Sequence, residues 1–287
     1  MKAIYKKELK SYFTSMLGYA MIAFFLLVVG VYFWGVNLSG GSAAIGNTLS
    51  NISFVYTVVL PILTMRLLAE EQKQKTDQLL FSTPVSIWDV VIGKFFAVVT
   101  VFTFPIVVIC TMPLVLKQFG NVLFLKSYST IFAFWLLGCV MLAFGLFISS
   151  LTENQIIAAV VSFAFNIVIL LMTSIASMMP ATAIASLIGF SVLLAVVAIF
   201  IFVFVKNIIV AGACWIVAEA ALVIVYTVKS TLFESALEKV LGGISFYSRF
   251  NDFVNGNFSI ASIIYYITFI VLFLYLAVQS IQKRRWS

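Results

Sequence analysis

The sequence contains no histidine, so any chemistry would have to rest on other side chains, such as acidic, serine and cysteine residues. Without histidine, Ser–His triads, imidazole metal sites and histidine acid–base catalysis are excluded. The three cysteines lie inside apolar runs, without the paired spacing of a metal site, which is typical of small side chains in helix packing. They are Cys110, Cys139 and Cys214. We therefore predict no catalytic residue, no metal site and no cofactor.

Glu219 is the acidic residue that lies deepest in an apolar run, near the middle of residues 207–228. An acidic side chain at the centre of a membrane costs about 2.5–3.5 kcal/mol on insertion scales, so we expect it to be protonated or paired. One interpretation is a carboxyl group that couples transport to protons. The other is a hydrogen bond between helices, which we favour because no second intramembrane charge accompanies Glu219.

A charged segment at 66–89 is the strongest local signal for a partner, since it holds seven of the 27 charged residues. Helix formers dominate it until Pro84, which disfavours the helical conformation at the residue before it. Ser86 and Asp89 then form a capping box for the next helix. The apolar run at 79–81 would fit a groove on a soluble partner; the alternative is a solvated loop.

The elements around these residues are predicted to be membrane-spanning helices. Hydrophobic residues make up 63% of the 287 residues and charged residues 9%, against about 25% in soluble domains. The mean hydropathy is +1.18. This composition excludes a cytosolic enzyme, a secreted domain and a disordered protein. The apolar runs are continuous and about twice as long as the strands of a membrane β-barrel, so an all-α polytopic helix bundle is expected.

Eight apolar runs predict eight spans. They cover 18–37, 50–68, 90–116, 128–150, 155–178, 182–205, 207–228 and 260–281. An even number puts both termini on one side, which then carries 12 of the 17 lysine and arginine residues against 5 outside. The positive-inside rule makes that side cytoplasmic. Six spans would give the same orientation. The two counts differ in whether the tight hairpin at 182–228 crosses the membrane.

Two further segments have the pattern of helices that lie at the membrane surface. In residues 1–17 the lysines lie off an apolar stripe, which predicts an interfacial helix on anionic lipid, or else a simple basic flank. That stripe contains Tyr5, Leu9, Tyr12, Phe13 and Met16. In residues 230–258 we expect two external amphipathic helices, broken at Gly242-Gly243.

Four segments, in this order, resemble the membrane subunit of type-2 ABC exporters, with the closest likeness to the gliding-motility-associated permeases. They are Lys-Glu-Leu-Lys-Ser-Tyr-Phe at 7–13, the run from Arg66 through Pro84-Val85-Ser86 to Gly93-Lys94, Ser-Ser-Leu-Thr-Glu-Asn-Gln at 149–155, and Phe-Tyr-Ser-Arg-Phe at 246–250 with the C-terminal run to Trp286. The likeness covers roughly 1–178 and 240–287. The hairpin at 182–228 departs from the family's six-span core.

The resemblance implies a permease that pairs with a second copy or a related permease and with a separate ABC ATP-binding subunit. This chain itself lacks the Gly-x4-Gly-Lys-Ser/Thr phosphate loop. A cytoplasmic coupling helix at 69–88 would dock the ATPase. Its docking residues would be Glu71, Thr76, Gln78, Leu79, Leu80, Phe81 and Pro84.

By the same likeness, the first, second and fifth spans line a translocation path. Polar residues facing it would be Thr57, Thr64, Ser162, Asn166 and Thr173, for which hydrogen bonding between helices is the alternative role. We expect a bacterial plasma-membrane protein that contacts lipid and no nucleic acid.

The leading hypothesis is therefore the permease subunit of an ATP-driven exporter. A secondary transporter coupled to an ion gradient through Glu219 is the alternative. The missing inverted repeat and the lack of matching broken helices argue against it. A membrane-embedded enzyme is a third class, for which the sequence offers no histidine, metal cluster or serine with a visible base. The sequence does not indicate the substrate.

Overall fold

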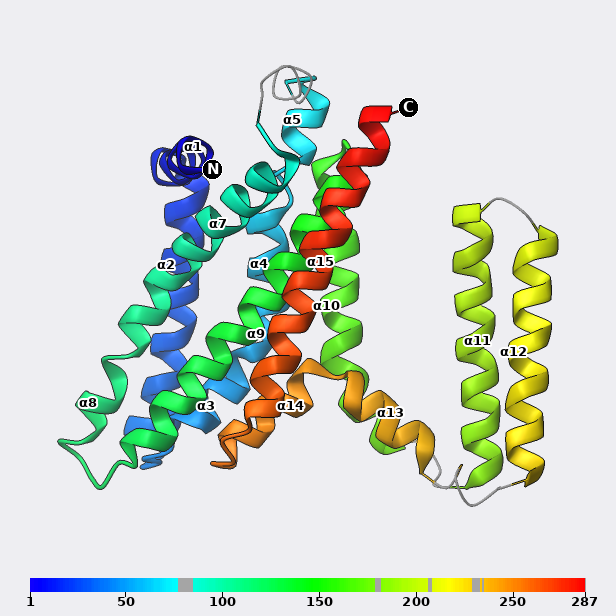
Figure 1. Ribbon diagram of the computed structural model, residues 1–287. Coiled ribbons are helices and arrows are strands. Elements are labelled where there is room, and N and C mark those ends of the chain that lie inside the picture. Colours follow the sequence, from blue (N-terminus) through cyan, green and yellow to red (C-terminus); the bar gives the residue numbers. More distant parts are fainter. Residues whose placement is uncertain (77–84, 179–181, 206–207, 229–232, 234, 287) are drawn as a thin grey trace. The chain divides into compact units, whose positions relative to one another are not determined.

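The computed structural model describes residues 1–286 apart from 77–84, 179–181, 206–207, 229–232 and 234 (Figure 1). In this part of the chain all regular structure is helical, as predicted. The chain divides into two compact units. Unit 1 comprises Met1–Leu170 and Arg249–Ser287, and unit 2 comprises Leu171–Ser248.

Six helical segments of the described residues are long and apolar enough to cross a membrane, so this is a multi-pass membrane protein. They are Gly18–Ser39, Ile45–Lys73, Ile87–Leu116, Phe124–Leu151, Gln155–Met178 and Ile260–Arg284. The elements that build them are α2 (Met16–Tyr32), η1 (Phe33–Ser39), α3 (Ile45–Ile52), η2 (Ser53–Val55), α4 (Tyr56–Thr64), α5 (Ala69–Lys73), α7 (Ile87–Ile109), α8 (Met112–Leu116), α9 (Phe124–Leu151), α10 (Gln155–Met178) and α15 (Ile260–Trp286).

Unit 2 contains the predicted hairpin as two helices packed side by side, α11 (Ala183–Val205) and α12 (Ile208–Val228). Their fully described apolar parts, Ala183–Ala195 and Cys214–Thr227, are too short to count as spans. Six helical segments of the described residues are therefore candidate spans, and the total of eight stays a prediction.

The interior of unit 1 is built around α4 and α9, the most deeply buried spans. Gly145 on α9 lets α4 approach closely, because a Cβ there would collide with the Thr64 hydroxyl. Tyr56 stacks on the Phe134 ring and donates a hydrogen bond of 3.1 Å to its carbonyl oxygen. Since lipid supplies little hydrophobic drive between helices, such close packing and hydrogen bonding hold a bundle together.

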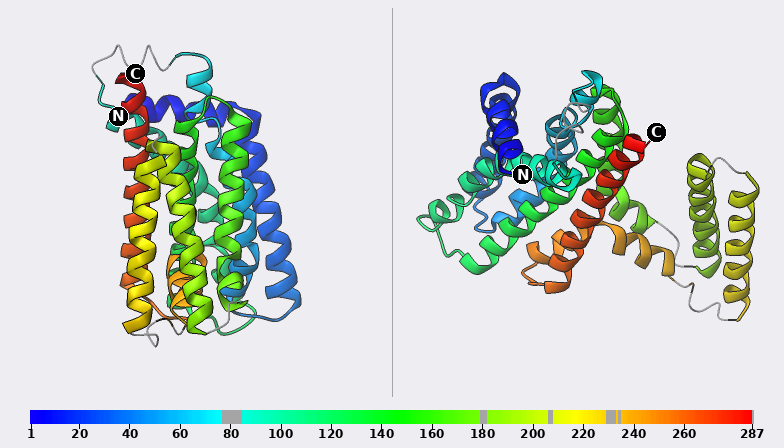
Figure 2. Two further views of the ribbon diagram at one scale, coloured as in Figure 1. Left: turned by 90° about the vertical axis from the view of Figure 1, so that its right-hand side faces the viewer. Right: turned by 45° about the horizontal axis from the view of Figure 1, so that its top comes forward.

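The helix α1 (Lys2–Thr14) lies across the ends of the spans (Figure 2). It ends where Ser15 turns to extended backbone, close to the predicted end of the interfacial segment. Its lysines stay exposed while Tyr12 is buried. Met16, which we placed on the apolar stripe, instead belongs to α2 and is 87% exposed.

Two short helices, α13 (Ala236–Ile244) and α14 (Phe246–Val254), occupy most of the predicted external segment. The predicted break at Gly242-Gly243 is wrong, because both glycines lie inside α13. The chain breaks at Ser245, which is extended and whose hydroxyl oxygen accepts the Ser248 N–H at 3.3 Å. The Ser245 side chain accepts a free N–H group at the start of α14, which a glycine without a side chain cannot do.

Candidate functional site

The segment 65–76 leaves the bundle at the end of unit 1 that carries both termini, called the termini end below (Figure 1). The predicted coupling helix over 69–88 is wrong as a continuous helix, because α5 ends at Lys73. Lys75 is left-handed, with φ of 55°. The N–H groups of Lys75 and Thr76 bond to the carbonyls of Gln72 and Glu71, which is the Schellman arrangement that terminates a helix.

A buried ion cluster ties α5 to two other helices. Lys94 on α7 is 1% exposed, and its Nζ lies 2.8 Å from a carboxylate oxygen of Glu8 on α1 and 3.0 Å from one of Glu71 on α5. It also donates a hydrogen bond of 2.7 Å to the Leu67 carbonyl. The ammonium thus has three acceptors for its three protons. Lys7, which is exposed, lies 3.5 Å from Glu71 and balances the second carboxylate.

A second contact joins α1 to the end of α4. The Tyr12 hydroxyl donates a hydrogen bond of 2.5 Å to the Leu63 carbonyl. The Arg66 guanidinium lies 4.5 Å from the Tyr12 ring and donates to the Ser15 hydroxyl at 3.2 Å. Burial raises the pKa of Tyr12, against the lowering effect of Arg66, so the phenol keeps its proton and remains a donor.

A third contact joins α5 to the end of α9. The Ser149 hydroxyl oxygen accepts the N–H groups of Leu68 and Ala69 at 3.0 Å each and donates to the Met65 carbonyl at 3.2 Å. It therefore caps the start of α5 from another helix, where the N–H groups have no partner within the helix. Gln72 adds a bond of 3.2 Å to the Ser150 carbonyl.

The same Ser150 carbonyl also binds the C-terminal helix α15. It accepts hydrogen bonds from Ser280 at 3.2 Å and from Arg284 at 2.5 Å. Segment 65–76 is thus bonded to α1, α7 and α9, and α9 is in turn bonded to α15. A displacement of α5 must move these helices or break buried polar contacts.

The predicted docking residues fall into three groups. Glu71 is engaged inside the chain with Lys94, so the structure does not present it as a free contact. Thr76 is exposed, and its hydroxyl donates to the Glu71 carbonyl at 3.3 Å. Gln78, Leu79, Leu80, Phe81 and Pro84 lie outside the described residues. At the following helix, Ser86 is the N-cap of α7 as predicted, but its side chain makes no capping hydrogen bond.

The predicted path residues lie in helix packing. Thr57, Thr64, Ser162 and Asn166 are each at most 5% exposed, and Thr173 is half-buried. The Thr57 hydroxyl donates to the Phe54 carbonyl of η2 at 2.6 Å, and the Thr64 hydroxyl donates to the Leu60 carbonyl of α4 at 3.0 Å. The side-chain amide oxygen of Asn166 has no hydrogen-bond partner among the described residues. Neither of the two threonine hydrogen bonds joins different spans, so both the transport role and the interhelical hydrogen bonding of these residues stay predictions.

Glu219 on α12 accepts a hydrogen bond of 2.5 Å from the Ser191 hydroxyl on α11. This is the interhelical contact that the packing interpretation predicts. Its other carboxyl oxygen is buried and has no hydrogen-bond partner in the part of the chain that the structure describes.

Lys94, Glu8 and Ser149 are the residues whose roles sequence reasoning missed. A usable signal was present for Lys94, because a lysine inside an apolar run must find a partner. For Ser149 no signal existed, since its partners are backbone N–H groups 80 and 81 residues away. Among the described residues no group of histidine, cysteine or acidic side chains could hold a metal ion.

No protein-family model and no curated protein matches this chain.

Proposed function

We propose that this chain is the membrane-spanning permease subunit of an ATP-driven ABC exporter. The observation that supports the proposal is the bonding of segment 65–76 to helices α1, α7 and α9 through buried polar groups. A soluble subunit that pushes on such a segment moves spans directly, because packed contacts of this kind shift as units. The resemblance of segments along the chain to type-2 ABC permeases supports the same function.

ATP hydrolysis belongs to a separate chain in this proposal, because the sequence holds no phosphate loop. The ATPase docks on residues 76–84, with Leu79, Leu80 and Phe81 in its groove. Glu71 positions the segment through Lys94.

A second copy or a related permease completes the transporter. We propose that all eight helices of span length cross a bacterial plasma membrane, with both termini in the cytoplasm. The helices α11 and α12 have 23 and 21 residues. At about 1.5 Å per residue each exceeds the ~30 Å hydrocarbon core.

The experiment is co-purification of the ATPase with tagged permease, together with transport-linked ATP hydrolysis. Replacing Leu79 and Leu80 by Asp puts two charges into the proposed groove. If these leucines are binding hot spots, the loss is about 2 kcal/mol or more, which is about 30-fold in affinity. The permease should still insert, because no span is altered.

The matched control is the same double substitution at Leu114 and Leu125, which are 54% and 85% exposed and lie outside the lining of both pockets described below. It should leave the ATPase bound. Retention of the ATPase and of coupled hydrolysis by the Leu79 and Leu80 variant would show that this segment is not the coupling element.

A further inference from the structure

Two pockets share the lining residue Ala43, close to the starts of α3 and α9. These helix starts lie at the end of unit 1 opposite the termini (Figure 1). The smaller one has a volume of about 140 Å³. Its lining includes Ala44, Ile45 and Gly46 at the start of α3, and Lys126 and Ser127 in the first turn of α9. No acidic side chain is among its lining residues.

Both helices that begin at this pocket lack a side-chain cap. Ala44 is the N-cap of α3 and Leu123 that of α9, and neither makes a capping hydrogen bond. In the described part of the chain the N–H groups of Ile45 and Gly46 find no acceptor. Uncapped helix starts present N–H donors and a positive dipole end, which together attract anions.

Two side chains add donors to these backbone groups. Ser127 is 5% exposed and lines the pocket, and its hydroxyl has no hydrogen-bond partner among the described residues. Lys126 forms no ion pair with any described residue. The methylene chain of Lys126 lies against Gly256, where an added Cβ would be 3.4 Å from the Lys126 Cδ. Gly256 has a φ of 93°, a backbone conformation that favours glycine.

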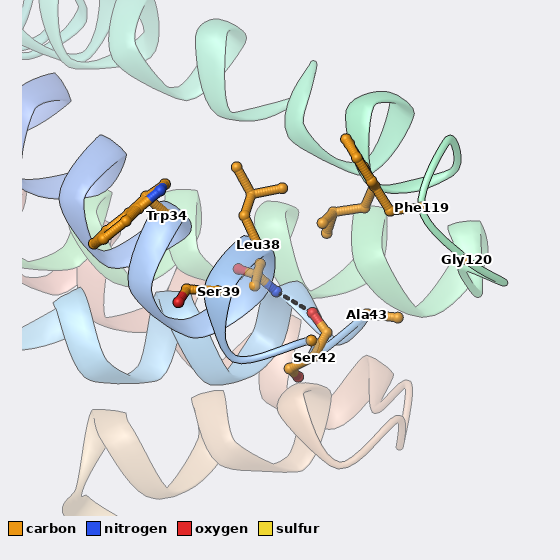
Figure 3. A pocket seen from close by; sticks show the side chains of 10 residues that line it. Trp34, Leu38, Ser39, Ser42, Ala43, Phe119 and Gly120 are labelled. Atoms are coloured by element: carbon orange, nitrogen blue, oxygen red, sulfur yellow. Dashed lines mark hydrogen bonds between the residues drawn. The ribbon is translucent and has the colours of Figure 1, made fainter.

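The larger pocket is a cavity of about 580 Å³ next to the first, and Ala43 lines both. Figure 3 shows Trp34, Leu38 and Phe119 around it. The intervening loop is fixed by the Asn37 amide, which donates to the Ser42 carbonyl at 2.6 Å. The two pockets together offer donors for an anionic head beside an apolar wall.

We propose that the smaller pocket binds the phosphate group of an anionic ligand, with any apolar part of that ligand in the larger cavity. An ammonium, a buried hydroxyl and free N–H groups at helix starts are the donor set that recognises phosphate. A phospholipid headgroup and free phosphate share this chemistry. The site is independent of the proposed ATPase, which would dock on residues 76–84.

The test uses the purified full-length protein in detergent and native mass spectrometry. The probes are dioctanoyl phosphatidylglycerol, dioctanoylglycerol without a phosphate, and inorganic phosphate. Lys126→Gln should weaken binding of phosphatidylglycerol about tenfold, since it removes a charged hydrogen-bond donor. Lys117→Gln is the matched control, because Lys117 lies over the Phe124 ring, outside the pocket lining, and loses the same charge.

Binding of phosphatidylglycerol but neither of dioctanoylglycerol nor of phosphate supports a lipid-borne phosphate. If inorganic phosphate competes with phosphatidylglycerol, the same site binds free phosphate. Equal effects of the two lysine variants, or equal binding of dioctanoylglycerol, overturn the proposal.

Ala44→Asp tests the site without removing a lysine. An aspartate at the N-cap would occupy the free N–H groups and add a negative charge, while capping α3. We expect phosphatidylglycerol binding to be lost with the melting temperature retained. Unchanged binding by this folded variant would equally overturn the proposal.

Discussion

Lys94 is a charge removed from water, and its ammonium is stable there only because Glu8, Glu71 and the Leu67 carbonyl replace the water. Removing one partner of a buried ion pair destabilises the protein by more than the net stability that the pair contributes, because the remaining charge is left buried without compensation. The two glutamates are 14% and 16% exposed, so some hydration remains available to them.

Lys94→Met should therefore destabilise the protein by about 3 kcal/mol, at the lower end of the range for breaking a buried pair. Adding Glu8→Gln and Glu71→Gln should recover a large part of this loss, because the uncompensated carboxylates are gone. Thermal unfolding in detergent measures both. A triple variant less stable than Lys94→Met would show that the carboxylates do not act through Lys94.

Ser149→Ala should cost about 1–3 kcal/mol, because it leaves the N–H groups of Leu68 and Ala69 buried without an acceptor. Ser150→Ala is the matched control, since that hydroxyl only donates to the Phe147 carbonyl of its own helix. Denaturation of both variants in the same detergent gives the comparison. Equal losses would mean that Ser149 does not cap α5.

Glu219→Gln should leave transport and ATP hydrolysis largely intact. The amide keeps an oxygen that accepts the Ser191 hydroxyl but cannot carry a proton. The measurement is substrate export from proteoliposomes with the ATPase present. Loss of export in a normally assembled variant would favour the transporter driven by an ion gradient.

At the scale of elements, helix existence was predictable and helix ends were less so. The apolar runs located all six candidate spans of the described residues, because the bilayer requires about 20 apolar residues per helix. The ends depend on single polar groups: Ser245 and not the glycine pair divides α13 from α14, and a Schellman turn ends α5 at Lys73. The ion cluster was invisible to local patterns because it joins residues 86 positions apart.

Lys75→Gly should stabilise the turn that ends α5, since a left-handed conformation costs a non-glycine residue roughly 1 kcal/mol. The expected result is slower hydrogen exchange at the Thr76 amide, which bonds to the Glu71 carbonyl at 3.0 Å. Lys73→Gly removes the same charge from inside the helix and should speed exchange there. Faster exchange in Lys75→Gly would contradict this account of the turn.

At the scale of the whole molecule, the two ends of unit 1 differ in how they treat charge. At the termini end, the buried Lys94 is paired with Glu8 and Glu71 on two other helices. At the opposite end, Lys126 faces a pocket without acidic lining. The first arrangement suits the transmission of force between fixed parts, and the second suits an exchangeable ligand. Both follow from the rule that a charge near the membrane must find a partner or water.

The number of spans depends on whether the hairpin at 182–228 crosses the membrane. If α11 and α12 both cross, residue 206 lies in the cytoplasm, on the side that carries 12 of the 17 lysine and arginine residues. In a variant whose Cys110, Cys139 and Cys214 are replaced, Lys206→Cys should resist an impermeant thiol reagent in intact cells and react after permeabilisation. Lys10→Cys and Lys117→Cys supply the inside and outside controls. A six-span chain would instead leave the hairpin outside, because residue 206 would then follow the fifth span without a further crossing. Labelling of Lys206→Cys in intact cells, at the rate of Lys117→Cys, would therefore exclude eight spans.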